Sequence, residues 1–331
     1  MHRNRIVLAT IAATLLLPAA VSAATSRTHV SNGGSDANTA FSCDYAHPCR
    51  TFAAALGQTT AGGEILAIDG SGYGKVVIDR SVSIIAAPGV FAGIGVGAGG
   101  NATGVHIATA GVNVVLRGLT ITGQGGTYGI NMTSGASLSI EDCAISNFYG
   151  LNQSGLRVSA PAQVRVSDTL FYRNGVNGLG VHIRGGAVAS MAGVRFIDSS
   201  ATVYSDAGVT RLGLSDALGV GASFYSNGGA TGADESTLDI TDSEMGLSGT
   251  VAYTWATHGT AAASVGNTLV AENQVPLRAR TGKVVLRGNT IVQNNNGFYA
   301  DTTGVTETDQ TNVVRDNVTN TWGTITNFSP M

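Results

Sequence analysis

The sequence has few charged residues, few cysteines and little apolar sequence in long runs. Asp, Glu, Lys and Arg make up only 12% of the 331 residues, and the formal net charge is −3. A nucleic-acid partner is not expected, because binding phosphates requires a basic face. The low charge does not by itself indicate a membrane protein. The apolar stretch from Ile6 to Ala20 falls short of the roughly 20 residues that span a bilayer.

The first residues are typical of a secretory signal peptide. Arg3 and Arg5 precede the apolar stretch, and small residues up to Ala23 follow it. This pattern predicts a signal peptide over residues 1–23, cleaved after Ala23. The alternative, a membrane anchor, is disfavoured by the short stretch and by Pro18 within it. Removing two arginines would change the net charge from −3 to −5, and the mature protein is expected to be secreted or periplasmic, without a membrane span.

The three cysteines exclude a closed site made of thiolates alone. Cys43 and Cys49 lie six residues apart in a loop-like stretch, and export favours their oxidation to a disulfide. A metal site with His47 is the alternative, but it would have only three ligands. Cys143 has no His at a fixed offset and is predicted to be a small buried residue, not a nucleophile. No metal site is predicted, although an acidic stretch, residues 234–244, leaves Ca²⁺ binding as an alternative to a solvated loop.

A short phrase recurs along the chain: an apolar strand, then a turn with Asp, Asn or Gly, then a second apolar segment. Its first residues are Leu116, Ile140, Val166, Met191, Leu214, Ile240, Val265 and Leu286. The intervals run from 21 to 26 residues, which indicates a stacked β-solenoid. The 46 glycines suit tight turns.

Two columns of polar residues are predicted at the turns of this solenoid. The first column contains Gly118, Asp142, Asp168, Gly193, Asp216, Asp242, Asn267 and Gly288. The second contains Gln124, Asn147, Asn174, Ser199, Ala222, Ser248, Asn273 and Asn294. Asp and Asn favour turns because they bond to nearby backbone amides, and stacked Asn side chains bond to one another. A pair of catalytic carboxylates is the alternative for the aspartates, but the turn position favours a structural role.

The organisation of the chain follows from where the repeat begins and ends. Residues 24–60 precede it and contain a short predicted helix with Phe52, Ala55 and Leu56 on one face. Such a helix would cap the exposed end of a solenoid core. We predict a cap over residues 24–60, a single solenoid domain over residues 61–301 and a polar C-terminal tail over residues 302–331.

The mature chain resembles secreted bacterial right-handed parallel β-helix proteins of the pectin-lyase-like class. The segments that carry the resemblance are Val30-Ser-Asn-Gly-Gly-Ser-Asp-Ala-Asn38, Pro48-Cys-Arg-Thr-Phe-Ala-Ala-Ala-Leu56 and the coils of about 25 residues. It implies an all-β, right-handed parallel β-helix, a single-stranded β-solenoid of about eight to ten coils with a short N-terminal capping helix. The class includes lyases, hydrolases, epimerases, tailspikes and adhesins, so fold alone does not select an activity.

The catalytic motifs of the enzymes in this class are mostly missing. The Gly-His-Gly and Arg-Ile-Lys motifs of polygalacturonases are matched only weakly, by Gly180-Val-His-Ile-Arg184. The sequence contains no Asp-Asp pair. The pectate lyase arginine motif is distorted in Gln274-Val-Pro-Leu-Arg-Ala-Arg280, and Asp-Pro-His is absent. The catalytic residues are therefore left unassigned.

One candidate site remains after the turn columns are set aside. Outward positions of successive second strands are predicted to form a ladder of Arg157, His182, Arg184, Tyr204 and Asp206. The strand that begins at Val203 is aligned with the one that begins at Val181, which places Tyr204 beside His182 and Asp206 beside Arg184. A second group lies further along, at Arg278, Arg280, Tyr299 and Asp301. Arg holds carboxylates and Tyr offers a stacking face, so the ladder would suit an acidic polysaccharide. The alternative is a solvated strand face whose Arg and Asp residues pair loosely.

These observations favour an exported β-helix protein that binds carbohydrate or has a structural role at the cell surface or outside the cell. The first alternative is a lyase or hydrolase of an acidic polysaccharide, in which Arg184 would neutralise a uronate while His182 or Tyr204 removes a proton. The second is an adhesin-type scaffold. The oligomeric state does not follow from the sequence.

Overall fold

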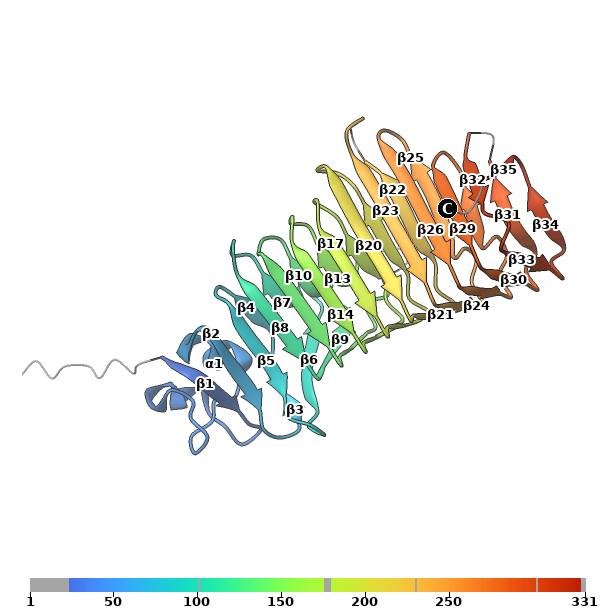
Figure 1. Cartoon of the computed structure of the whole chain (residues 1–331). Coiled ribbons are helices and arrows are strands. Elements are labelled where there is room, and N and C mark those ends of the chain that lie inside the picture. Colours follow the sequence, from blue (N-terminus) through green and yellow to red (C-terminus); the bar gives the residue numbers. More distant parts are fainter. Residues whose placement is uncertain (1–23, 101, 176–179, 230, 302, 329–331) are drawn as a thin grey trace, which may run out of the picture.

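The chain forms a right-handed parallel β-solenoid built from three sheets around one apolar core. The computed structural model describes residues 24–100, 102–175, 180–229, 231–301 and 303–328. Figure 1 shows the strands stacked along one axis, from the blue N-terminal end to the red C-terminal end. The predicted signal peptide, residues 1–23, lies outside the described residues.

Sheet A has 13 strands, each paired in parallel with the strand one coil further along the chain. Its strands are β1 (Thr25–Val30), β2 (Thr59–Ala67), β5 (Val82–Ala86), β8 (Asn113–Arg117), β11 (Ser137–Glu141), β14 (Gln163–Ser167), β17 (Val188–Ala192), β20 (Val209–Ser215), β23 (Glu235–Thr241), β26 (Thr260–Gly266), β29 (Lys283–Arg287), β32 (Val305–Thr308) and β35 (Ile325–Asn327).

Sheets B and C have 11 strands each, arranged in the same parallel way. Sheet B consists of β3 (Ser71–Gly72), β6 (Ala92–Gly97), β9 (Leu119–Gln124), β12 (Ala144–Ser146), β15 (Leu170–Tyr172), β18 (Arg195–Ile197), β21 (Leu218–Val220), β24 (Glu244–Gly246), β27 (Leu269–Ala271), β30 (Thr290–Val292) and β33 (Val313–Arg315). Sheet C consists of β4 (Val76–Ile78), β7 (Thr103–Ile107), β10 (Tyr128–Met132), β13 (Ser154–Val158), β16 (Val181–Ile183), β19 (Ala201–Tyr204), β22 (Phe224–Gly228), β25 (Ala252–Ala256), β28 (Leu277–Ala279), β31 (Asn296–Ala300) and β34 (Thr319–Trp322).

The register of sheet A confirms the repeat predicted from the sequence. Register pairs join the first residues of successive predicted repeats into one buried column of Leu116, Ile140, Val166, Met191, Leu214, Ile240, Val265 and Leu286. Burial alternates along each strand, so that in β14 Val164 and Val166 face the core while Arg165 is exposed. The predicted coils are the middle coils of the solenoid, and further coils extend the stack at both ends.

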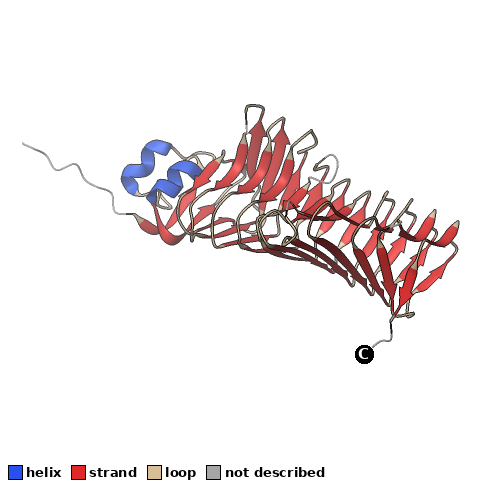
Figure 2. Cartoon of the chain, turned by 90° about the horizontal axis from the view of Figure 1, so that it is seen from above, coloured by secondary structure: helices blue, strands red, loops and turns tan. Residues whose placement is uncertain are grey.

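The N-terminal end is closed by two short helices and a disulfide. The helices are η1 (Asp36–Phe41), which is a 3₁₀ helix, and α1 (Phe52–Gln58). The Thr51 side chain accepts a hydrogen bond from the Ala54 amide and caps α1, whose buried face contacts the core. Cys43 and Cys49 form the predicted disulfide. Figure 2 shows the helices gathered at this end of the solenoid.

Left-handed backbone explains the first polar column. Asp142, Asp168, Asp216 and Asp242 follow or end sheet A strands with φ between 48° and 50°. Gly118, Gly193 and Gly288 also have positive φ at the matching turns of other coils. Asp and Asn tolerate this conformation better than most other residues with a side chain. These carboxylates are therefore turn residues, as the repeat predicted.

The second polar column is an amide ladder in the C-terminal coils. Asn273 Nδ2 donates to Asn294 Oδ1 (3.0 Å), and Asn294 Nδ2 donates to Asn317 Oδ1 (2.9 Å). The prediction is wrong at Asn147, which has a φ of 65° and occupies a left-handed turn instead. Phe148 stands at the ladder position there, and its amide donates to Asn174 Oδ1 (3.2 Å).

The C-terminal residues do not form the predicted polar tail. Strands β32, β33, β34 and β35 continue all three sheets within residues 303–328. In β32 the positions that face inward are Thr306 and Thr308, which are 1% and 7% exposed. Threonine replaces aliphatic residues at these positions, which is why the apolar repeat ended near residue 301 although the coils continue.

We predict that Asn294→Ala lowers the free energy of unfolding by about 1–3 kcal/mol, because it leaves buried backbone and amide groups of the ladder without partners. Urea denaturation would measure this change. Asn295→Ala alters an exposed side chain next in the chain and should change the free energy by less than about 0.5 kcal/mol. Equal effects of the two substitutions would contradict a stabilising role for the ladder.

Candidate functional site

The ladder predicted from the sequence lies on the outer face of sheet C. Arg157 is on β13, His182 on β16 and Tyr204 on β19. Arg184 directly follows β16, and Asp206 lies two residues after the end of β19. Arg157 and His182 are register partners on neighbouring strands. All five side chains are partly exposed. The structure thus places the predicted residues on one face, within three successive coils.

The predicted alignment of Tyr204 with His182 is wrong by two residues. His182 pairs with Thr202 instead. Tyr204 lies beside Arg184, whose Cζ is 5.4 Å from the centroid of the Tyr204 ring. A shift of two residues keeps the side chain on the same face, because strand side chains alternate with a period of two. Tyr204 therefore remains part of the ladder, with a different neighbour.

The charge of Arg184 is already balanced within the protein. Its Nε donates to Asp206 Oδ2 at 2.8 Å, and a second guanidinium nitrogen contacts the same oxygen. The Gly185 amide donates to the other carboxylate oxygen at 2.9 Å. The mechanism considered for a lyase needs Arg184 free to neutralise a substrate carboxylate. The structure instead pairs it with Asp206, which was expected to lie in the same ladder.

His182 is held in its neutral form. Burial lowers its pKa to about 4, and the positive charges of Arg184 and Arg157 act in the same direction. The carboxylate of Asp206 opposes these effects without reversing them. At neutral pH His182 therefore offers one ring nitrogen as a hydrogen-bond acceptor and the other as a donor. Its ring centroid lies 6.4 Å from that of Tyr204.

Sequence reasoning missed the aromatic residues that extend this face. Tyr225 on β22 and Tyr253 on β25 are register partners, and their ring centroids lie 5.8 Å apart at 75°. Trp255 is 41% exposed, and Arg280 lies over its ring with Cζ 5.5 Å from the centroid. The sequence did contain a pattern that could have revealed them, because Tyr225 is followed two residues later by Asn227, and Tyr253 by Trp255. These two coils were not aligned with the ladder.

A shallow cavity of about 520 Å³ connects the predicted and the missed residues. Its lining residues are His182, Arg184, Thr202, Tyr204, Tyr225, Asn227, Tyr253, Trp255 and Arg280. We call this surface the aromatic groove. Asn227 Oδ1 is buried there and has no hydrogen-bond partner among the described residues. The groove therefore presents ring faces together with an unused buried acceptor.

The aromatic column continues toward the C-terminal end. Arg278 lies between two rings, with its Cζ 5.5 Å from the centroid of Tyr253 and 5.2 Å from that of Tyr299. Its charge is balanced by Asp301, whose Oδ2 lies 3.0 Å from a guanidinium nitrogen. Tyr299 in turn stacks on Trp322, with centroids 6.1 Å apart. The two predicted Arg–Asp groups on sheet C therefore share one design, an arginine clamped between a carboxylate and an aromatic ring.

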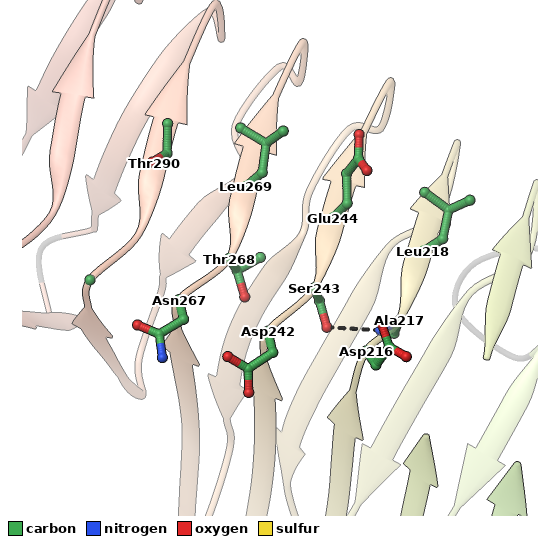
Figure 3. Close-up of a pocket in the computed structure, with 11 residues that line it drawn as sticks. Asp216, Ala217, Leu218, Asp242, Ser243, Glu244, Asn267, Thr268, Leu269 and Thr290 are labelled. Atoms are coloured by element: carbon green, nitrogen blue, oxygen red, sulfur yellow. Dashed lines mark hydrogen bonds between the residues drawn. The ribbon is translucent and has the colours of Figure 1, made fainter. Parts of the chain in front are cut away.

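A second hollow, of about 630 Å³, lies beside the turns between sheets A and B. Figure 3 shows Asp216, Asp242 and Asn267 along it, one from each successive coil. All three have left-handed backbone, and the Ala217 amide donates to Ser243 Oγ at 3.1 Å. These polar residues serve the turns, so the hollow is a by-product of the stacked turn column and is not the stronger candidate site.

The described residues contain neither a cluster that could hold a metal ion nor a helix that could cross a membrane. No three His, Cys, Asp or Glu side chains come close enough together in the described residues to hold a metal ion. Nor does any helix in that part of the chain have the length and apolarity needed to cross a membrane. Cys143 is buried with its pKa raised to about 11 by that burial, as expected for a structural residue.

Comparisons with known proteins identify the fold. Residues 67–217 match a protein-family model described as a right handed beta helix region. The search of curated proteins found no match. Among solved structures, pectate lyase Pel9A aligns with a TM-score of 0.55 and 13% sequence identity, over 87% of this chain and 75% of that one. The protein therefore has the pectin-lyase-like, right-handed parallel β-helix fold, and the resemblance inferred from its sequence is confirmed at this level.

We predict that His182 makes the protein less stable as the pH falls from about 6.5 to about 4. The unfolded histidine has the ordinary pKa and binds a proton in this range, whereas the folded one does not. The contribution amounts to about 3 kcal/mol across the range. Urea denaturation of His182→Gln at several pH values should show a flatter dependence on pH than the wild type. His258→Gln, at an exposed turn, should keep the wild-type dependence. Parallel curves for wild type and His182→Gln would contradict this role.

Proposed function

We propose that the protein is an exported polysaccharide-binding protein that holds a sugar chain in the aromatic groove of sheet C. The observation that carries the proposal is the run of partly exposed rings at Tyr204, Tyr225, Tyr253 and Trp255 on consecutive strands. Tyrosine and tryptophan offer an apolar face and a polar tip. Sugar rings have matching apolar faces edged by hydroxyl groups.

The spacing of the groove supports an extended ligand that runs along the solenoid axis. The lining residues come from or adjoin β16, β19, β22, β25 and β28. At about 4.8 Å between neighbouring strands, these five strands extend over roughly 19 Å. That length exceeds a disaccharide.

The charge pattern of the groove supports recognition of ring faces more than recognition of charge. Arg184 is balanced by Asp206, and Arg278, just beyond the lining, is balanced by Asp301. His182 is neutral because its pKa is lowered. Arg280 is the one lining arginine without an ion pair in the described residues. The rings are thus the main attractive feature that the groove offers.

Export is supported by two observations of different kinds. The sequence of residues 1–23 predicts a signal peptide. The disulfide between Cys43 and Cys49 is of the kind that persists in oxidising compartments. Detection of the mature protein in the periplasm or the medium, with Ala24 as its N-terminal residue, would test this part of the proposal.

A polysaccharide lyase is the second candidate function. It is favoured by His182, which is neutral at physiological pH and lies beside Tyr204 and Arg184. A neutral imidazole can accept a proton from a sugar ring carbon. Against it stands the ion pair that engages Arg184. The solved pectate lyase shares the fold at 13% identity, and such a likeness leaves the activity open.

We predict that Trp255→Ala weakens retention on bound polysaccharides about three- to tenfold, because a stacked ring contributes roughly 0.5–1.5 kcal/mol. Tyr253→Ala should act in the same direction. Affinity electrophoresis through gels that contain each polymer would measure the change. Tyr172→Ala removes an exposed ring from sheet B and should leave retention unchanged. An equal loss in the control would contradict binding at the groove.

We further predict that the polymer is retained without being cut. Ultraviolet absorbance would detect the unsaturated ends that β-elimination creates, and a reducing-end assay would detect hydrolysis, with and without Ca²⁺. Product release that is lost in His182→Gln would establish the lyase instead. If no acidic or neutral polymer is either retained or cut, the structural or adhesin-type role becomes the better interpretation.

A further inference from the structure

Another hollow lies on the outer face of sheet C, the face that also carries the aromatic groove, and is nearer the N-terminal end. Its volume is about 750 Å³, and its lining includes Lys75, His106, Tyr128, Asn131 and Arg157. These residues come from or adjoin β4, β7, β10 and β13. We call this surface the basic hollow. Its polar lining differs from that of the aromatic groove.

The basic hollow has a positive charge that the protein does not balance. Lys75 and Arg157 line it, and no Asp or Glu is among the lining residues. Neither cation forms an ion pair within the described part of the chain. This contrasts with Arg184 further along the face, which is paired with Asp206. The formal charge of the whole chain is negative, so the hollow is a local exception.

Two buried polar atoms in this hollow also lack partners. Asn131 is only 8% exposed, and its Oδ1 has no hydrogen bond in the described residues. The Nε atom of Arg157 is also buried and has no hydrogen-bond partner in that part of the chain. The two residues are register partners on β10 and β13. One atom is an acceptor and the other is a donor, so two polar groups beside the hollow are left unsatisfied by the described residues.

The guanidinium of Arg157 is positioned before any ligand arrives. One of its terminal nitrogens donates to the Tyr128 hydroxyl at 2.5 Å, and its Cζ lies 5.2 Å from the centroid of the Tyr128 ring. These contacts fix a long side chain that would otherwise lose rotamer freedom on binding. The planar guanidinium then presents its remaining donors in a geometry that suits a carboxylate or a sulfate.

We infer that the basic hollow binds the anionic group of an acidic sugar, a carboxylate or a sulfate ester, in the same chain that occupies the aromatic groove. This inference rests on the proposed function, because it assigns a ligand class to that binding face. The basic hollow and the aromatic groove adjoin, because Arg157 of the basic hollow pairs in register with His182 of the aromatic groove. Together they extend over nine strands, from β4 to β28, or about 38 Å.

Matched polymers test the inference directly. Polygalacturonate is compared with its methyl ester, and dextran sulfate with dextran, so that each pair differs in its anionic groups. Wild-type protein is expected to bind a charged member at least tenfold more tightly than its neutral partner. The double variant Lys75→Gln/Arg157→Gln is expected to lose that preference, because the ratio of its affinities for the charged and the neutral member falls to about one. The pair that shows the preference identifies the carboxylate or the sulfate ester.

A double variant with the same change in charge is the control. Arg165→Gln/Arg195→Gln removes two exposed arginines from sheets A and B and should retain the preference. Loss of preference in this control would overturn the inference in favour of non-specific attraction. Lys75→Gln alone alters an exposed side chain and should weaken binding of the charged polymer at least threefold, so the test stands even if replacing Arg157 impairs folding.

The outcomes separate this inference from the proposed function. If wild-type protein binds both members of each pair equally, and Trp255→Ala weakens both, polysaccharide binding stands and the anionic site is overturned. If no polymer binds, both are overturned. A second readout is the ring resonances of His106, which are expected to shift on titration with galacturonate and not with its methyl ester. Shifts with both sugars would contradict an anion site at this hollow, and so would shifts with neither if polygalacturonate is the preferred polymer.

Discussion

The structure depends on parallel pairing in which each residue lies next to its counterpart one coil away. Because each coil repeats the register of the one before, a property at one position becomes a column, as Leu116, Ile140 and Val166 show in the core. A slip of one residue would turn such a column to the solvent. The same rule acts on the outer face, where Tyr225 and Tyr253 become neighbours through register alone.

The turns constrain where a functional site can be built. Each coil must satisfy its backbone at tight turns, and the chain uses Asp142, Asp168 and Asn294 for this purpose. A residue at the first of these turns must tolerate left-handed backbone, as Gly118 and Gly193 also do in their coils. The outward side chains of the strands are not constrained in this way, because they take no part in the backbone hydrogen bonds between strands. Variation in function is therefore expected on a sheet face, and sheet C has the aromatic and basic residues.

The sequence predicted the fold better than it predicted the site, for a physical reason. Apolar alternation repeated over many coils determines the fold, and errors in single coils do not matter. The site depends on the register of single coils, and alternation cannot distinguish a shift of two residues. Ile183 pairs with Val203, only 20 positions later. This spacing is shorter than those of the neighbouring coils of sheet C, so the sequence alignment placed Tyr204 beside the wrong residue. The last coils were missed because Thr306 and Thr308 occupy core positions that are usually aliphatic.

The charge on the outer face of sheet C could not be deduced from the sequence either, because it depends on contacts between coils. Asp206 balances Arg184 from 22 residues away, and Asp301 balances Arg278 in the same manner. Arg157 has a tyrosine hydroxyl as its partner and forms no ion pair with a carboxylate in the part of the chain that the structure describes. Arginines that look alike in the sequence thus differ in the charge they present to a ligand. One face consequently passes from a basic hollow with unpaired cations near the cap to an aromatic groove in which Arg184 is paired with Asp206. A long chain lying on this face would meet the two environments in that order.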